Sequence, residues 1–206
     1  MTPVDRSASS GDDEGDDRDD HLVERTLREH EVFHGSFLRL RRDDVRLPDG
    51  HVATREFVVH PGAVAIVALL DDGRIVLERQ HRYPVGRVLL EIPAGKIDPG
   101  EALLACARRE LLEETGYVAR EWAYACEIHN AAAYSTESIH LYFARGLELR
   151  ERQLDQGEFI EVVHCTEAEL DAWAARGDLR DVKTLIALQW LQRWRAGSWS
   201  LDWQGS

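Results

Sequence analysis

Short segments rich in apolar and β-branched residues alternate with turn-forming residues over the first half of the chain. Residues 37–47 and 51–59 lie on either side of the turn sequence LPDG, and residues 62–70 and 74–83 flank a second turn sequence, DDG. The third run, GAVAIVALL, is apolar throughout, which predicts a central strand covered on both faces. Residues 87–94 make a fifth run, where we expect another strand.

The period changes in residues 95–117, where apolar side chains follow a helical spacing. Leu104, Ala107 and Leu111 fall at i, i+3 and i+7 and form one core-facing stripe. Gly116 is well placed to end the helix in a left-handed cap. The segment is therefore predicted to be a helix entered from a Gly/Pro turn.

The second half of the chain predicts three more strands and then two helices. The strands are residues 121–130, 137–147 and 158–166. Thr166 and Glu169 form a capping box for the first helix, and residues 181–197 make a second amphipathic helix. Strands on both sides of a helix, with two helices at the end, indicate an α/β fold in which a mixed sheet lies between helices.

Composition divides the 206 residues into a tail and a folded part. Residues 1–20 carry eight acids, two arginines and almost no apolar residues. They cannot bury enough surface to fold, and we expect them to be disordered. Residues 21–60 are predicted to form an N-terminal β extension, and residues 61–200 the main domain.

Charge and cysteine usage exclude several classes of protein. A formal charge of −13 argues against nonspecific nucleic-acid binding, which needs a basic face. No apolar run approaches the ~18 residues that span a membrane, and the acidic N-terminus lacks the apolar region of a signal peptide. Cys106, Cys126 and Cys165 are too far apart to favour a zinc site or a disulfide framework. The simplest interpretation is a reduced, cytoplasmic protein.

Three glutamates crowd one stripe of the helix predicted in residues 95–117. At ~100° per residue, Glu113 and Glu114 lie about 60° to one side and about 40° to the other side of Glu110. If the stripe were half-buried, each pair ~6 Å apart would repel by roughly 3 kcal/mol. The stripe is therefore either a solvated face or a site where cations offset the repulsion.

The spacing in residues 95–117 resembles the Nudix box of the Nudix hydrolases, G-x5-E-x7-R-E-U-x-E-E-x-G-U, where U is a bulky aliphatic residue. Every fixed polar and glycine position is present, and only Tyr117 departs, being aromatic. The stretches TREFVVHPGAVAIVAL, ERQHRYPVGRVLLEIPAGKID and LDQGEFIEVV resemble the ADP-ribose pyrophosphatase branch of that family. The similarity runs from about residue 30 to residue 195.

The resemblance implies a Nudix α/β/α sandwich with a mixed sheet and an N-terminal β-hairpin extension, and a homodimer that exchanges N-terminal elements. It also implies a Mg²⁺ site, at which Mn²⁺ is expected to substitute, built from Glu110, Glu113, Glu114 and the backbone carbonyl of Ala94. Such hard cations prefer oxygen ligands. Four further box residues have a structural interpretation: Gly95, Glu101, Arg109 and Gly116.

Other residues match positions that contact substrate in the family, and each has a simpler alternative. Arg82 matches a phosphate contact, or forms a surface salt bridge. Arg55 and Glu56 match positions near the adenine, or belong to an edge strand of alternating charge. Glu91 either helps to bind metal or forms a buried ion pair.

The attacking water needs a general base. In this branch the base often comes from a mobile loop beyond the box, which here reads DQGEFIEVV and supplies Glu158. A solvated loop acid is the alternative interpretation of Glu158. Glu161 is the fallback base, and Glu113 is the next candidate.

The resemblance implies hydrolysis of ADP-ribose to AMP and ribose 5-phosphate. One loop, NAAAYSTES, departs from the branch, because Ala132 and Ala133 stand where Pro-Gly is usual, while Tyr134 and Glu137 remain. That loop touches the sugar end of the substrate in relatives, so an enzyme for other, or multiple, nucleoside diphosphate sugars is the alternative. A noncatalytic nucleotide-sensing module is disfavoured, because the box is intact and no DNA-binding domain is visible.

Overall fold

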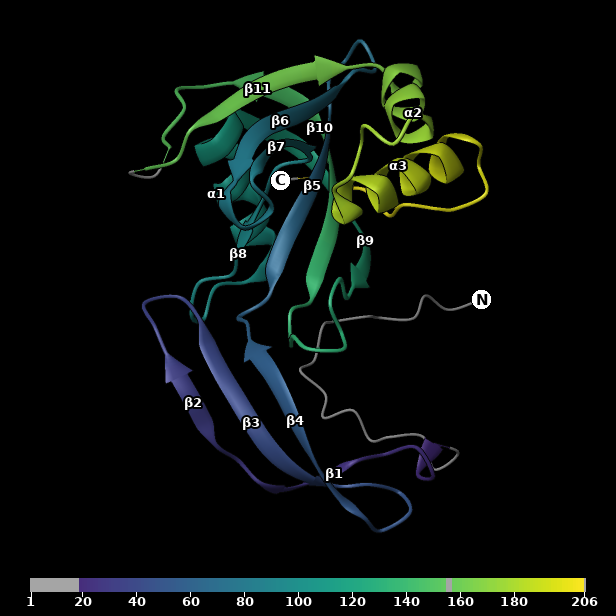
Figure 1. Cartoon of the computed structure of the whole chain (residues 1–206). Coiled ribbons are helices and arrows are strands. Elements are labelled where there is room, and N and C mark those ends of the chain that lie inside the picture. The colour runs from purple at the N-terminus through teal and green to yellow at the C-terminus, as the bar shows by residue number, and fades with distance from the viewer. Residues whose placement is uncertain (1–18, 155–156, 206) are drawn as a thin grey trace. The chain divides into compact units, whose positions relative to one another are not determined.

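The computed structural model describes residues 19–154 and 157–205 (Figure 1). The described residues fall into two compact units, one ending at Val58 and the other beginning at Val59. Nearly all of the tail that the sequence predicts to be disordered, residues 1–18, lies outside the described residues.

The N-terminal unit is a four-stranded sheet built around β3 (Arg39–Arg46). Strand β3 pairs with β4 (Val52–Val59), with β2 (Glu31–His34) along its first half and with β1 (Arg25–Arg28) along its second half. The sequence pattern predicts β3 and β4 but misses β1 and β2. Every residue of those two short strands is exposed, so neither strand needs the apolar alternation by which strands are recognised.

The second unit is built on an eight-stranded mixed sheet. Its strands are β5 (Ala63–Leu69), β6 (Ile75–Arg82), β7 (Arg87–Glu91), β8 (Ala94–Lys96), β9 (Tyr117–Ile128), β10 (Ile139–Leu149), β11 (Ile160–Cys165) and β12 (Gln204–Gly205). The main order is β11-β6-β5-β10-β9-β12, with β7 beside β6 and β8 beside β5. Strands β5 and β10 are parallel, whereas β9 and β10 are antiparallel, so the predicted mixed sheet is confirmed.

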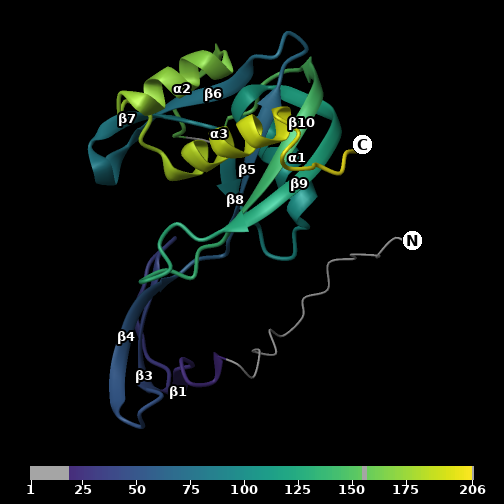
Figure 2. The ribbon, with the colours of Figure 1, turned by 90° about the vertical axis from the view of Figure 1, so that its right-hand side faces the viewer.

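Helices cover both faces of this sheet. Helix α1 (Leu103–Thr115) packs on one face, and α2 (Glu167–Ala175) and α3 (Val182–Arg195) pack on the other (Figure 2). All of β5 is buried, and its alternate residues enter two separate apolar cores, one against α1 and one against α3. The α/β/α arrangement with a central, doubly covered strand is confirmed.

Local sequence sets the ends of the three helices. Gly116 ends α1 in the left-handed conformation, with φ 78°. Thr166 and Glu169 form the capping box of α2, and the carboxylate of Asp181 caps α3 by accepting the amide of Thr184 at 2.9 Å. Within the described ranges, none of the helices has the length and apolarity that a membrane span requires.

The run over residues 87–94 is two strands rather than one. Strand β7 pairs with β6, whereas β8 pairs with β5. Pro93 lies between them and has no N–H to continue a ladder, and its carbonyl accepts the amide of Ile66 of β5 at 2.9 Å. This switch of partners carries the chain from the end of β7 to the loop that precedes α1.

Candidate active site

Arg109 ties helix α1 to the loop before it. Its Nε and Nη2 donate to the two carboxylate oxygens of Glu101 at 2.9 and 2.8 Å, and Nη2 also donates to the carbonyl oxygen of Lys96 at 3.1 Å. The hydrogen bonds from Arg109 lower the pKa of Glu101 to about 2. Ala102 offers no side-chain cap to α1, and this ion pair is one of the contacts that fix the loop against the helix.

The remaining nitrogen of Arg109 faces the glutamate stripe. Nη1 donates to Glu110 at 2.8 Å and to Glu113 at 3.0 Å. Gly95 passes directly beneath Glu110, since a Cβ on Gly95 would lie 1.8 Å from Cδ of Glu110. Any larger residue at position 95 would displace this carboxylate, so the glycine allows the backbone to approach it.

Glu114 is the most deeply buried member of the stripe. It is 5% exposed, and its Oε2 accepts the amide of Ala94 at 3.0 Å. A second carboxyl, Glu78 of β6, lies within hydrogen-bonding reach and is 3% exposed. Burial raises the pKa of both groups. The charge of Glu78 adds to this effect at Glu114, whereas the charges of Arg152 and Lys183 oppose it at Glu78. Among the described residues, no Lys, Arg or His forms a salt bridge with either one.

Sequence reasoning missed Glu78. Residues 74–83 predict a strand, in which successive side chains face opposite sides. Val76 belongs to the core beneath α1, so Glu78 occupies an inward position where an apolar residue is expected. A charged residue at such a position was the signal that could have identified it.

Glu158 and Glu161, the two candidate bases that follow the Nudix box in the chain, lie in different places. Burial is the main cause of the raised pKa of Glu114, and the charge of Glu158 adds to it, which puts Glu158 near the stripe. Glu161 is opposite Arg79 in the β11–β6 register and forms a salt bridge with it at 2.6 Å. Arg79 follows Glu78 in β6, so Arg79 and Glu161 point to the opposite face of the sheet.

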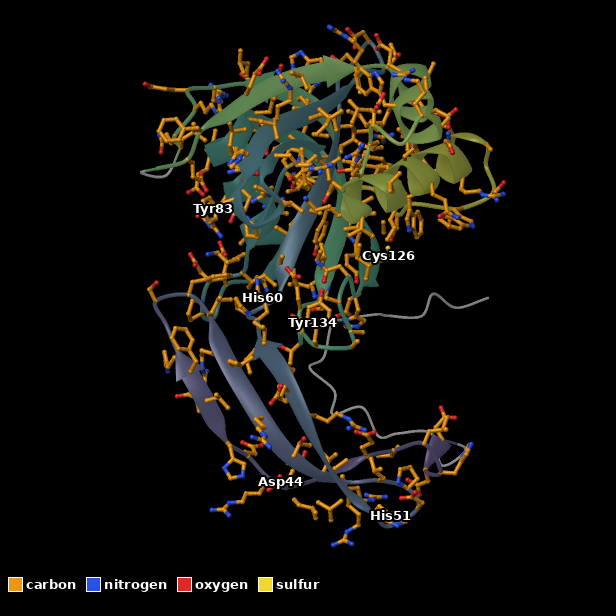
Figure 3. The ribbon with its side chains drawn as sticks, in the orientation of Figure 1. Asp44, His51, His60, Tyr83, Cys126 and Tyr134 are labelled. Atoms are coloured by element: carbon orange, nitrogen blue, oxygen red, sulfur yellow. The ribbon has the colours of Figure 1, made fainter. Side chains whose placement is uncertain are left out.

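Arg82 and Glu91 form a two-point ion pair across β6 and β7, with hydrogen bonds of 2.9 and 2.8 Å. Lys183 binds the same carboxylate and also Asp181, at 3.0 Å. Burial alone would raise the pKa of Glu91, but Arg82 and Lys183 outweigh it and lower the pKa to about 2. The Arg82 side chain keeps 41% of its surface exposed, and the next residue, Tyr83, is 88% exposed (Figure 3). Glu91 therefore fixes a guanidinium that still faces solvent.

Arg55 and Glu56 lie in β4. Arg55 forms an ion pair with Glu24, and Glu56 lies 3.8 Å from Arg42. Both contacts are made within the N-terminal unit, where the side chains of Arg55 and Glu56 remain largely exposed.

Family models match nearly all of the described chain. A model of the NUDIX domain matches residues 59–186. The chain belongs to the Nudix family. Residues 95–117 are its Nudix box, and the chain is a Nudix hydrolase. A model of the nucleoside diphosphate sugar hydrolase N-terminal domain matches residues 24–58.

Individual proteins are similar to this chain over most of its length. The methanol dehydrogenase activator of Bacillus methanolicus is 39% identical over 171 residues, which cover 82% of this chain and 92% of that protein. The ADP-ribose pyrophosphatase of Bacillus subtilis (strain 168) is 38% identical over 173 residues, covering 83% of this chain and 94% of the relative. A crystal structure of an ADP compounds hydrolase has the same fold, with a TM-score of 0.76 and 24% identity, covering 85% of this chain and 96% of that one.

The Nudix box offers the oxygen ligands that hard divalent cations prefer. Among the residues described, no three His, Cys, Asp or Glu side chains already converge as metal ligands would. Arg109 instead holds Glu110 and Glu113, and the amide of Ala94 holds Glu114. A buried carboxyl beside a second carboxyl, with no cation paired to it, is an unfavourable arrangement that a bound cation would relieve. The residues of the Nudix box therefore fit such an ion.

Proposed function

We propose that this Nudix hydrolase cleaves the pyrophosphate bond of ADP-ribose, giving AMP and ribose 5-phosphate, with Mg²⁺ as cofactor and Mn²⁺ as a substitute. The observation that carries the metal-dependent chemistry is the burial of Glu114 beside Glu78, with no salt bridge to either among the described residues. The choice of ADP-ribose draws on the name of the Bacillus subtilis relative and on the match of residues 24–58.

Glu110, Glu113, Glu114 and the carbonyl of Ala94 hold the divalent cations in this proposal. When bound, these ions offset the negative charge of the diphosphate and polarise its phosphorus–oxygen bonds. Glu158 accepts the proton of the attacking water. Its contribution to the raised pKa of Glu114 supports a position on the same side of the domain as the glutamates of the Nudix box.

Arg82 binds a phosphate of the substrate. A guanidinium offers a planar set of donors that matches phosphate oxygens, and Glu91 holds that of Arg82 with two hydrogen bonds. Lys183 donates a further hydrogen bond to the Glu91 carboxylate. Arg82 therefore enters the reaction already oriented, and little side-chain entropy is lost when substrate binds.

We also propose a homodimer in which the extension, residues 21–60, is the dimerisation element. Among the described residues of the N-terminal unit only Asp43 and Val45 are buried. Large apolar side chains of this unit are exposed: Leu22, Val23, Leu27, Val32, Phe33, Phe37, Leu38 and Val52. A second copy would cover this surface and bring Arg55 and Glu56 to the adenine of its partner's substrate. Light scattering that shows a fully active monomer would contradict the dimer.

The three cysteines are all free. Free thiols persist in a reducing compartment, which supports our placement of the enzyme in the cytoplasm.

A panel of nucleoside diphosphate sugars, with chromatographic identification of the products, tests the proposed function. We expect the highest kcat/KM for ADP-ribose, AMP as a product, no turnover in EDTA and recovery with Mg²⁺ or Mn²⁺. Preference for another sugar would select the alternative substrate class, which the loop containing Ala132, Ala133 and the 63% exposed Tyr134 favours (Figure 3). Full turnover in EDTA would contradict the metal-dependent chemistry itself.

A further inference from the structure

Glu78 is a buried carboxyl that none of the roles above uses. It lies in β6 on the sheet face that α1 covers, and it is 3% exposed. Its Oε1 has no hydrogen-bond partner. Among the described residues, the other buried polar side-chain atom without a hydrogen-bond partner is Nε of Arg152. Because almost all buried polar atoms in folded proteins are hydrogen-bonded, the unpartnered oxygen requires an explanation.

Carboxyl groups are the neighbours of Glu78 on its own strand pair and on α1. Glu114 lies within hydrogen-bonding reach, and Glu91 of β7 is directly opposite in the strand register. Two positive side chains contribute at longer range. Of these, Lys183 is already bound to Glu91, and Arg152 donates to a backbone carbonyl. Among the described residues, neither of these two cations forms a salt bridge with Glu78, although the charges of both lower its pKa.

Carboxylate oxygens are the preferred ligands of hard divalent cations, and ligands from two adjacent elements are common in such sites. We propose that Glu78 is a further ligand of a divalent cation, Mg²⁺ or Mn²⁺, bound between β6 and α1 and shared with Glu114. The proposal rests on the proposed function, because Glu114 is a ligand in both. It assigns the unpartnered Oε1 of Glu78 to the metal.

A buried ion pair between Glu78 and Arg152 is the competing explanation. The two unpartnered atoms carry opposite charges, yet they are not bonded to each other. Arg152 is anchored by Nη2 to the carbonyl oxygen of Ile160 at 2.9 Å. An ion pair with Arg152 would also leave Glu114 beside Glu78 without a cation, whereas a shared metal ion serves both carboxyls.

Mn²⁺ binding to the full chain in the absence of substrate tests this assignment. Electron paramagnetic resonance counts free Mn²⁺ during titration, and thermal unfolding is followed in EDTA and in Mn²⁺. The variants are Glu78→Gln, Glu78→Val and Glu114→Gln. Glu121→Gln is the matched control, because Glu121 of β9 pairs with Arg145 at 2.5 Å at a surface position.

We expect both Glu78 variants to bind Mn²⁺ at least about 10-fold more weakly than the unaltered chain, or to bind one ion fewer. In EDTA they should unfold at the same temperature or higher, because a neutral side chain removes the repulsion with Glu114. Their stabilisation by Mn²⁺ should shrink accordingly. Glu121→Gln should bind Mn²⁺ as the unaltered chain does.

Normal Mn²⁺ binding in Glu78→Gln, together with loss of binding in Glu114→Gln, would overturn this assignment and leave the proposed function standing. Normal binding in both variants would overturn both. Weakened binding in Glu78→Val but not in Glu78→Gln would make Glu78 a positioning residue that acts through a hydrogen bond to Glu114, and so refute its role as a ligand. Unfolding of Glu78→Gln at a lower temperature in EDTA, with normal Mn²⁺ binding, would favour the ion pair with Arg152.

Discussion

Glu91 and Glu114 are almost equally buried, at 3% and 5% exposure, yet their pKa values move in opposite directions. Burial favours the protonated form of both. At Glu91, Arg82 and Lys183 overcome that effect and lower the pKa to about 2. At Glu114 burial comes first and neighbouring carboxylates add to it, so the pKa is raised.

Between these two buried glutamates, the missing cation partner, and not burial, distinguishes the proposed metal ligand. We call Glu91 and Glu101 the cation-paired glutamates, because Arg82, Lys183 and Arg109 neutralise them. We call Glu78 and Glu114 the cation-free glutamates. The chain supplies its own cations to Glu91 and Glu101, and the proposed metal ion binds at Glu78 and Glu114, which form no such pairs among the described residues.

The largest effect is expected when a cation-free glutamate is neutralised. Glu114→Gln should lower turnover by about 10³-fold or more, because a metal ion supplies several kcal/mol of charge stabilisation in the transition state. The apparent Mg²⁺ affinity should also fall, whereas the stability of the variant in EDTA should not fall. Steady-state kinetics over a Mg²⁺ titration measures both effects, and near-normal turnover at low Mg²⁺ would remove Glu114 from the metal site.

Glu158→Gln should act on proton transfer alone. We expect kcat to fall by at least about 10²-fold, the lower end of the effect of a general base, with little change in KM or Mg²⁺ dependence. Glu161→Gln is the control, because Glu161 points to the opposite face of the sheet. Loss of activity in Glu161→Gln but not in Glu158→Gln would show that the base is misassigned. Full activity in both would turn attention to Glu113.

Neutralising a cation-paired glutamate should instead change stability. Glu91→Gln removes the buried carboxylate that Arg82 and Lys183 share, although Lys183 keeps Asp181, and breaking such a buried pair costs about 3–5 kcal/mol of unfolding free energy. Urea unfolding in EDTA measures this. Glu121→Gln, which breaks an exposed pair, should cost no more than about 1 kcal/mol. Equal losses in the two variants would contradict the distinction between buried and exposed pairs.

The two groups should also respond to pH in opposite directions in the metal-free protein. The cation-paired glutamates have a pKa of about 2 against an ordinary 4.5, so their contribution to stability is complete above pH 4.5 and is lost as pH falls toward 2. The cation-free glutamates have a raised pKa, so stability is lost as pH rises above 4.5. Urea unfolding across this range checks the prediction. Mg²⁺ should remove the loss of stability that occurs as pH rises above 4.5, and should leave the loss that occurs as pH falls toward 2. An equal effect of Mg²⁺ on both losses would contradict the prediction.

Much of the fold follows from local pattern. Local sequence predicts the conformation of the apolar strand β5, of helix α1 with its apolar stripe, and of the helix caps at Gly116 and Thr166. Strands β1, β2 and β12 carry no such signal, because they are short and exposed and their pairing is set by distant residues. The glutamate stripe was visible because it lies within one helix.

Contacts between residues of different strands and helices could not be predicted from the sequence in this way. Glu78 meets Glu114, 36 positions away in the sequence, only because β6 passes beneath α1. Lys183 reaches Glu91 from the start of α3. Periodicity predicts which face a residue occupies, but it does not say which residue of another element lies opposite.

The central claim is that an external divalent cation takes the place of the proton on the cation-free glutamates. Calorimetric titration of the substrate-free protein with Mg²⁺ at neutral pH, in two buffers of different ionisation enthalpy, counts the protons released on binding. We expect release of about one proton or more per chain, since ligands must be deprotonated before they bind metal, and a smaller release in Glu114→Gln. Mg²⁺ binding without any proton release would contradict the account.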